Sequence, residues 1–96
     1  LEVAWLAEAT LVAGRVDEAR ALAGEAVELA RRYQERGNEA YALFVSGTVS
    51  QRDLDKGDNA AEAMFREALR TALACGMEPL VARCRRALGQ SEAERA

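Results

Sequence analysis

The sequence predicts an all-α domain made of antiparallel helix hairpins that stack side by side, with about five helices in all. Small and apolar residues recur at steps of three and four, a spacing that places them on one face of an α-helix. The clearest such face lies in 60–76, and the same frame shifted back by forty-two residues falls in 19–33. A repeat of this length is typical of helical repeat arrays. The two frames consist of Ala61, Phe65, Ala68, Ala72 and Cys75 and of Ala19, Ala23, Ala26, Ala30 and Tyr33.

The composition is that of one small helical domain. The chain has 96 residues, of which half are hydrophobic, 30% are charged and only one is proline. A chain of this size buries a single modest core, and this balance is not that of a disordered segment. A net charge of −3 without a basic cluster argues against nucleic-acid binding. No apolar run approaches the roughly 18 residues that span a membrane.

The sequence lacks the residue patterns that common catalytic and metal sites require. Histidine is absent, which removes the most frequent general base and metal ligand. There is no Cys-x-x-Cys pair for zinc and no phosphate-binding loop. We expect the two cysteines, Cys75 and Cys84, to be free thiols, because small helical cores use cysteine as a compact hydrophobic residue. The prediction is a non-catalytic domain without metal or cofactor.

Turn residues separate the first two helices. A first helix is predicted over 1–13, and Gly14 can adopt the left-handed conformation that ends it. Asp17 is predicted to cap a second helix that runs to about residue 35, with Gly37 stopping it in the same way. The inward side of the first helix is expected to consist of Val3, Leu6, Ala7, Thr10 and Leu11.

A third helix is predicted over 38–52, and the polar run 53–58 after it reads as a turn. Asn59 with Glu62 three residues later forms a capping box for a fourth helix, which Gly76 ends. Because the connections are short, successive helices are expected to lie antiparallel.

The fifth helix is predicted to begin at Glu78. Pro79 fits there, because the first turn of a helix does not need its missing N–H. The helix is expected to end near residue 89, with 91–96 frayed.

Two half-motifs recur along these helices. They read Leu43-x2-Ser46-Gly47 and Ala61-x3-Phe65-x2-Ala68, with weaker copies at Val3-x2-Leu6-Ala7 and Ala19-x3-Ala23-x2-Ala26. The pattern resembles the tetratricopeptide repeat (TPR) family, whose two helices carry W-x2-L-G-x2-Y and A-x3-F. Small residues at Ala7, Gly47 and Gly89 let the partner helix approach closely, and the ring of Phe65 fills the space between repeats.

This resemblance implies a TPR-like right-handed superhelix. Repeat one would be 1–36, repeat two 37–76, and 77–96 the first helix of a third repeat or a cap. The small residues are forty and forty-two positions apart, against the family's usual spacing of about 34. Such long, alanine-rich repeats are similar to the C-terminal TPR regions of bacterial ATPase, cyclase and transcriptional signalling proteins. The resemblance implies a cytoplasmic interaction or scaffold module, and Leu1 in place of methionine favours a piece of a larger protein.

In such a superhelix the first helices of the repeats line a concave groove that binds a partner protein or peptide. The resemblance places in this groove Leu1, Ala4, Glu8, Leu11, Tyr41, Phe44, Thr48, Gln51, Arg83, Arg86 and Gln90. Tyr41 and Phe44 would supply apolar contacts, and Arg83 and Arg86 would attract an acidic or amphipathic helix. In a plainer interpretation, the rings pack on neighbouring helices and the arginines form an ordinary solvated face.

Two other functions stay open: a ligand-sensing arm that controls an attached ATPase, cyclase or DNA-binding domain, and a structural dimerisation spacer. A groove filled by the chain's own side chains would favour the spacer. Trp5 is expected to be half-buried against a preceding repeat. Homo-oligomers could form through apolar residues expected to be exposed on the terminal helices, namely Val3, Leu6, Val81, Cys84 and Leu88.

Overall fold

The computed structural model describes residues 2–52 and 58–95, with side chains described over 2–52 and 60–89. Every regular element in these ranges is an α-helix, which confirms the predicted all-α class and the five helices. The helices are α1 (Glu2–Val12), α2 (Val16–Arg32), α3 (Arg36–Arg52), α4 (Asp58–Cys75) and α5 (Glu78–Arg95). The turn predicted at 53–58 falls mostly outside the described residues, and Asp58 is the first residue of α4.

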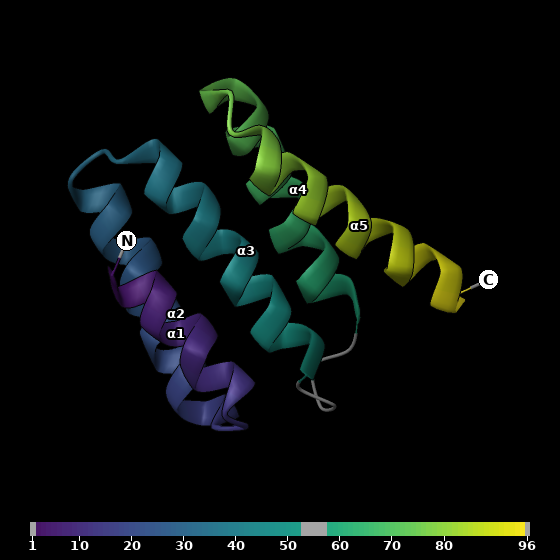
Figure 1. The fold of residues 1–96 in the computed structure, drawn as a ribbon, viewed down its shortest axis with the longest axis horizontal. Coiled ribbons are helices and arrows are strands. Elements are labelled where there is room, and N and C mark those ends of the chain that lie inside the picture. Colours follow the sequence, from purple (N-terminus) through teal and green to yellow (C-terminus); the bar gives the residue numbers. More distant parts are fainter. Residues whose placement is uncertain (1, 53–57, 96) are drawn as a thin grey trace.

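The five helices form two layers. Each helix packs antiparallel on the next one along the chain, and α1 also packs on α3. Figure 1 shows α1 over α2 and α5 over α4, with α3 between the two pairs. The thinnest dimension is 18 Å, close to two helix diameters of roughly 10 Å each. One face of the molecule therefore carries α1, α3 and α5, with α3 between the other two helices.

The two repeated frames supply much of the core. The buried members of the frames are Ala19, Ala23, Ala26 and Ala30 on α2 and Ala61, Phe65, Ala68 and Ala72 on α4. The last residue of each frame is exposed, contrary to prediction. Tyr33 is the C-cap of α2, and Cys75 is the final residue of α4, so both lie where the helix has left the packed region.

Helices α3 and α4 approach each other closely where Gly47 faces the ring of Phe65. A Cβ atom on Gly47 would lie 2.8 Å from Cε1 and 2.9 Å from Cδ1 of the Phe65 ring. That ring is fully buried and also packs against Phe44, with 5.6 Å between ring centroids. The absence of a side chain on α3 thus gives α4 room to place its largest buried residue there.

Two of the three predicted glycine stops are confirmed. Gly14 and Gly76 follow α1 and α4 with φ of 85° and 71°, in the left-handed region that glycine adopts without strain. The stop at Gly37 is wrong, because Gly37 lies inside α3. Gln34 takes the left-handed conformation after α2 instead, with φ of 55°.

The starts of α2, α3 and α4 differ from prediction by about two residues, whereas α5 begins at Glu78 as predicted. The N-cap of α2 is Arg15, which makes no side-chain capping bond, so Asp17 is not the cap. Asp17 lies in the first turn, where its carboxylate accepts a 2.8 Å hydrogen bond from Arg20. Asn59 lies within α4 instead of preceding it, and its side chain is outside the described residues. Pro79 lies in the first turn of α5 as predicted.

The terminal helices are only partly as expected. α5 continues to Arg95, so its predicted end near residue 89 is wrong. Val81 and Cys84 are buried, which contradicts the prediction that they are exposed. Both belong to the core cluster that includes α4 residues, since the α4–α5 packing uses this side of α5. At the other end Leu6 is exposed and Trp5 is 64% exposed, so the half-burial of Trp5 against a preceding repeat stays a prediction.

Candidate partner-binding face

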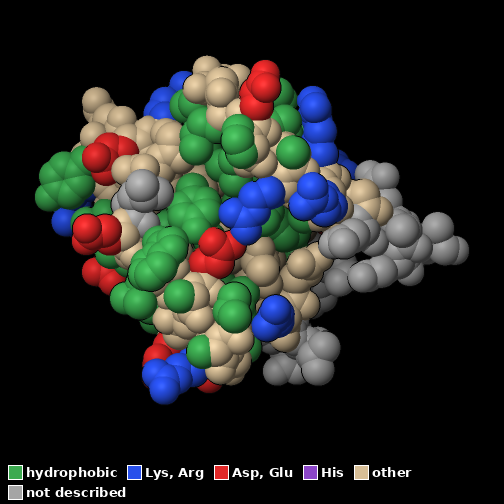
Figure 2. All heavy atoms as spheres, viewed as in Figure 1, with side chains coloured by type: hydrophobic (Ala, Val, Ile, Leu, Met, Phe, Trp, Pro, Cys, Tyr) green, Lys and Arg blue, Asp and Glu red, His purple; other side chains and the backbone are tan. Residues whose placement is uncertain are grey.

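The face formed by α1, α3 and α5 carries most of the predicted groove residues. In Figure 2, hydrophobic side chains gather across the middle of this face around acidic and basic groups. The three helices run in the same direction, because each pair of neighbours along the chain is antiparallel. Their first turns therefore meet at one end of the face and their later turns at the other.

Glu8 joins the three helices at the middle of the face. Its Oε1 atom accepts a hydrogen bond of 2.5 Å from the Tyr41 hydroxyl on α3, and its Oε2 atom accepts one of 2.5 Å from Arg83 Nη2 on α5. The guanidinium of Arg83 also lies over the ring of Phe44, 4.5 Å from its centroid. The charge of Arg83 is thus already paired within the chain, in a favourable position over an aromatic face.

The cluster changes how its members ionise. Partial burial works to raise the pKa of Glu8, but the hydrogen bonds from Tyr41 and Arg83 and the Arg83 charge outweigh it, so the pKa lies below its ordinary 4.5. Burial, followed by the hydrogen bond to Glu8 and the Glu8 charge, raises the pKa of Tyr41 to about 12. Around neutral pH the cluster therefore holds an ionised carboxylate and a neutral phenol.

Titration of Tyr41 tests this geometry. In a Tyr33→Phe background Tyr41 is the only tyrosine, so ultraviolet absorbance of tyrosinate reports it alone. We expect a midpoint near pH 12, against 10.0 for an ordinary phenol, with the stabilisation from this site lost as the pH rises from 10 toward 12. Glu8→Gln removes the neighbouring negative charge and should move the midpoint down. A midpoint that Glu8→Gln leaves unchanged would contradict the contact.

The remaining predicted residues fall into three groups. Ala4 and Leu11 are buried in the core, and the side chains of Leu1 and Gln90 lie outside the described residues. Phe44 is 7% exposed and accepts, through its carbonyl, a 3.0 Å hydrogen bond from the Thr48 hydroxyl. The structure brings together the others beside a small hollow of about 180 Å³, whose lining includes Phe44, Thr48, Gln51, Arg83 and Arg86.

A larger apolar hollow lies where the first turns of the three helices meet. About 470 Å³ of space is lined by Glu2, Trp5, Tyr41 and Met77. A second hollow of about 360 Å³ shares Tyr41 and Met77 with it and continues toward α5. We call the two together the Trp5–Met77 hollow. Sequence reasoning did not place Trp5 or Met77 on this face, although both lie next to the starts of helices that the predicted antiparallel order brings to one end.

Among the side chains of residues 2–52 and 60–89, no group of three or more acidic or cysteine residues is arranged to hold a metal ion. Both cysteines are free, Cys75 exposed and Cys84 buried. Burial raises the pKa of the Cys84 thiol, so it stays protonated and weakly nucleophilic. No helix in the same part of the chain is long and apolar enough to cross a membrane.

Comparison with known proteins gives no assignment. No protein-family model matches the chain, and neither a curated protein nor a solved structure matches it significantly. What the α1/α3/α5 face does is therefore inferred from its geometry.

Proposed function

We propose that this chain is a non-catalytic protein-interaction or scaffold module, built as a TPR-like right-handed superhelix in which the α1/α3/α5 face is the concave, partner-binding side. The Trp5–Met77 hollow is the observation that carries the proposal. An exposed tryptophan beside a tyrosine and a methionine is the kind of side-chain set that anchors protein partners. The regulatory or signalling parentage inferred from the repeat pattern belongs to the same proposal.

The expected partner is an amphipathic helix with an acidic end. Its apolar side chains would fill the Trp5–Met77 hollow at one end of the face. At the other end Arg86 is exposed beside the hollow that Phe44 and Thr48 line. Because Glu8 already pairs with Arg83, a carboxylate of the partner would meet Arg86 instead.

Selection from a randomised peptide display library tests this function directly. Peptides selected on the wild-type protein should bind Trp5→Ala about thirtyfold more weakly, because an aromatic hot spot contributes about 2 kcal/mol. Arg86→Glu should weaken acidic peptides, whereas Arg70→Glu should not. Arg70 is an exposed arginine on α4, in the other layer, and serves as the charge-matched control. Selected peptides that bind all three variants equally would discard the proposal.

The structural spacer is the main rival, and one observation favours it. The Glu8 cluster fills the middle of the face with the chain's own side chains and fastens α1 to α5 through Arg83. A spacer needs this connection but not an exposed Trp5. If the library yields no peptide whose affinity depends on Trp5, the spacer becomes the better account of this face.

A further inference from the structure

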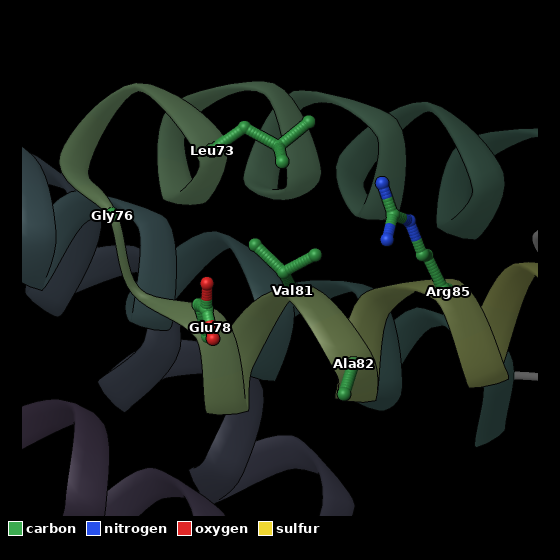
Figure 3. Close-up of a pocket in the computed structure, with 6 residues that line it drawn as sticks. All are labelled: Leu73, Gly76, Glu78, Val81, Ala82 and Arg85. Atoms are coloured by element: carbon green, nitrogen blue, oxygen red, sulfur yellow. The ribbon is translucent and has the colours of Figure 1, made fainter.

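A second surface lies on α5, at the edge of the array. It corresponds to the face of α3 on which α4 packs. A hollow of about 390 Å³ lies between the end of α4 and α5. Figure 3 shows Leu73 and Val81 turned toward one another across it, and the guanidinium of Arg85 reaching toward α4. The hollow is lined by Leu73, Gly76, Glu78, Val81, Ala82 and Arg85. We call this hollow, together with Gly89 further along α5, the α5 seat.

The internal repeat relates the α5 seat to the place where α4 packs on α3. Shifting by forty-two residues carries Ala40, Leu43 and Gly47 onto Ala82, Arg85 and Gly89. These positions are spaced by three and four residues, so they share one helix face. On α3 this face is buried beneath α4. On α5 the equivalent residues are exposed.

The two glycines show the difference most clearly. The Cβ position of Gly47 is blocked by the Phe65 ring at 2.8 Å, while nothing lies within 4 Å of the Cβ position of Gly89. An aromatic ring therefore fits at Gly89 as Phe65 fits at Gly47. The left-handed residues that precede the two helices also correspond, Gln34 before α3 and Gly76 before α5. The chain therefore enters α5 through the same backbone conformation as it enters α3.

Charge identifies a further property of the occupant. On the filled side Arg31 of α2 pairs with Glu67 of α4, with 3.2 Å between Nη2 and Oε1. The residue forty-two positions after Arg31 is Leu73, which carries no charge. The cation in the α5 seat is instead Arg85, exposed on α5. An acidic side chain placed like Glu67 would therefore find its partner on α5.

We propose that the α5 seat binds an amphipathic helix of the α4 type, with the face Ala-x3-Phe-x2-Ala packed against α5 and a glutamate two residues after the phenylalanine paired with Arg85. This inference does not depend on the proposed function of the α1/α3/α5 face. It concerns a different side of α5 and a different set of residues.

A peptide of residues 58–76 with Cys75→Ser is the probe, labelled for fluorescence anisotropy. We expect it to bind the wild-type protein, and Phe65→Ala in the peptide to weaken binding at least about tenfold. Gly89→Leu in the protein fills the seat and should also weaken binding at least about tenfold, with unchanged circular dichroism, since the substituted position is open. Gly24→Leu, at an equally open glycine on α2, is the matched control and should bind as the wild type does.

A charge exchange keeps the test decisive. Arg85→Glu should weaken the peptide, and Glu67→Arg in the peptide should restore binding to that variant. Absence of binding to the wild type overturns the proposal. So does binding that Gly89→Leu leaves intact, which would mean that the peptide displaces α4 from α3. Self-association of the protein that Gly89→Leu abolishes would assign the seat to a second copy and overturn the proposal.

Discussion

Phe65→Ala should be the most destabilising single truncation in this chain, at about 4 kcal/mol. The Phe65 side chain is fully buried, and its ring fills the space over Gly47 and packs against Phe44. Neither neighbour can collapse into the space left behind, because Gly47 has no side chain and the Phe44 ring is held beneath Arg83. The cost therefore includes both the lost apolar burial and the cavity.

Urea unfolding followed by circular dichroism measures this loss. A domain of this size has a stability of roughly 5–14 kcal/mol, so the midpoint should fall steeply while the slope stays the same. Leu73→Ala on the same helix is the control, since Leu73 is about half exposed and should cost less than about 0.5 kcal/mol. Equal losses for the two substitutions would mean that Phe65 is not the centre of the core.

The helices and their buried faces were predictable because they follow from local spacing. Periodicity at three and four residues identifies a face whatever that face packs against, and the forty-two-residue repeat marked two such faces. Gly47 and Phe65 were each predicted as packing positions for the same reason, but their contact with one another was not predicted. Gly14 and Gly76 marked helix ends through a backbone conformation that only glycine adopts freely.

The helix ends without a strong local signal were not predictable. Gln34 takes a left-handed conformation that is uncommon outside glycine, and Gly37 nearby was the more natural candidate. Arg15 caps α2 without a side-chain hydrogen bond, so no capping residue marks the start. The start and the end of α2 therefore carry no local residue signal from which they could be predicted.

The binding face shows the same division. The residue types of the groove were available from the repeat resemblance, but the pairing of Glu8 with Arg83 joins residues 75 positions apart. This pairing depends on how the three helices are spaced. It makes Arg83 a residue that connects α5 to α1, whereas the sequence alone predicted a cation free to bind a partner. The Trp5–Met77 hollow was within reach of the sequence. Helices of one direction start at one end, so Trp5, Tyr41 and Met77 had to lie near each other.

The effect of Gly47→Ala on stability should change sign with the residue that position 47 faces. In the wild-type protein the new methyl group would overlap the Phe65 ring, and overpacking of this kind costs about 1–3 kcal/mol. Alanine improves helix propensity by about 1 kcal/mol over glycine, so the net result is a loss of up to about 2 kcal/mol. In a Phe65→Ala background the ring is gone, and Gly47→Ala should instead stabilise the protein by about 1 kcal/mol.

Unfolding of the four proteins, with sucrose added to keep the weaker ones folded, yields the coupling between the two positions. We expect a coupling of about 1–3 kcal/mol, which is the overpacking cost that the Phe65 ring imposes. Gly24→Ala provides the control, because nothing lies near its Cβ position and it should stabilise both backgrounds equally by up to about 1 kcal/mol. The first hairpin already holds an alanine pair at the corresponding positions, Ala7 and Ala23, both buried. The double variant copies that pair into the second hairpin. If Gly47→Ala stabilises the Phe65→Ala protein, the two hairpins pack by the same rule with different side chains. An identical effect of Gly47→Ala in both backgrounds would contradict the contact between Gly47 and Phe65.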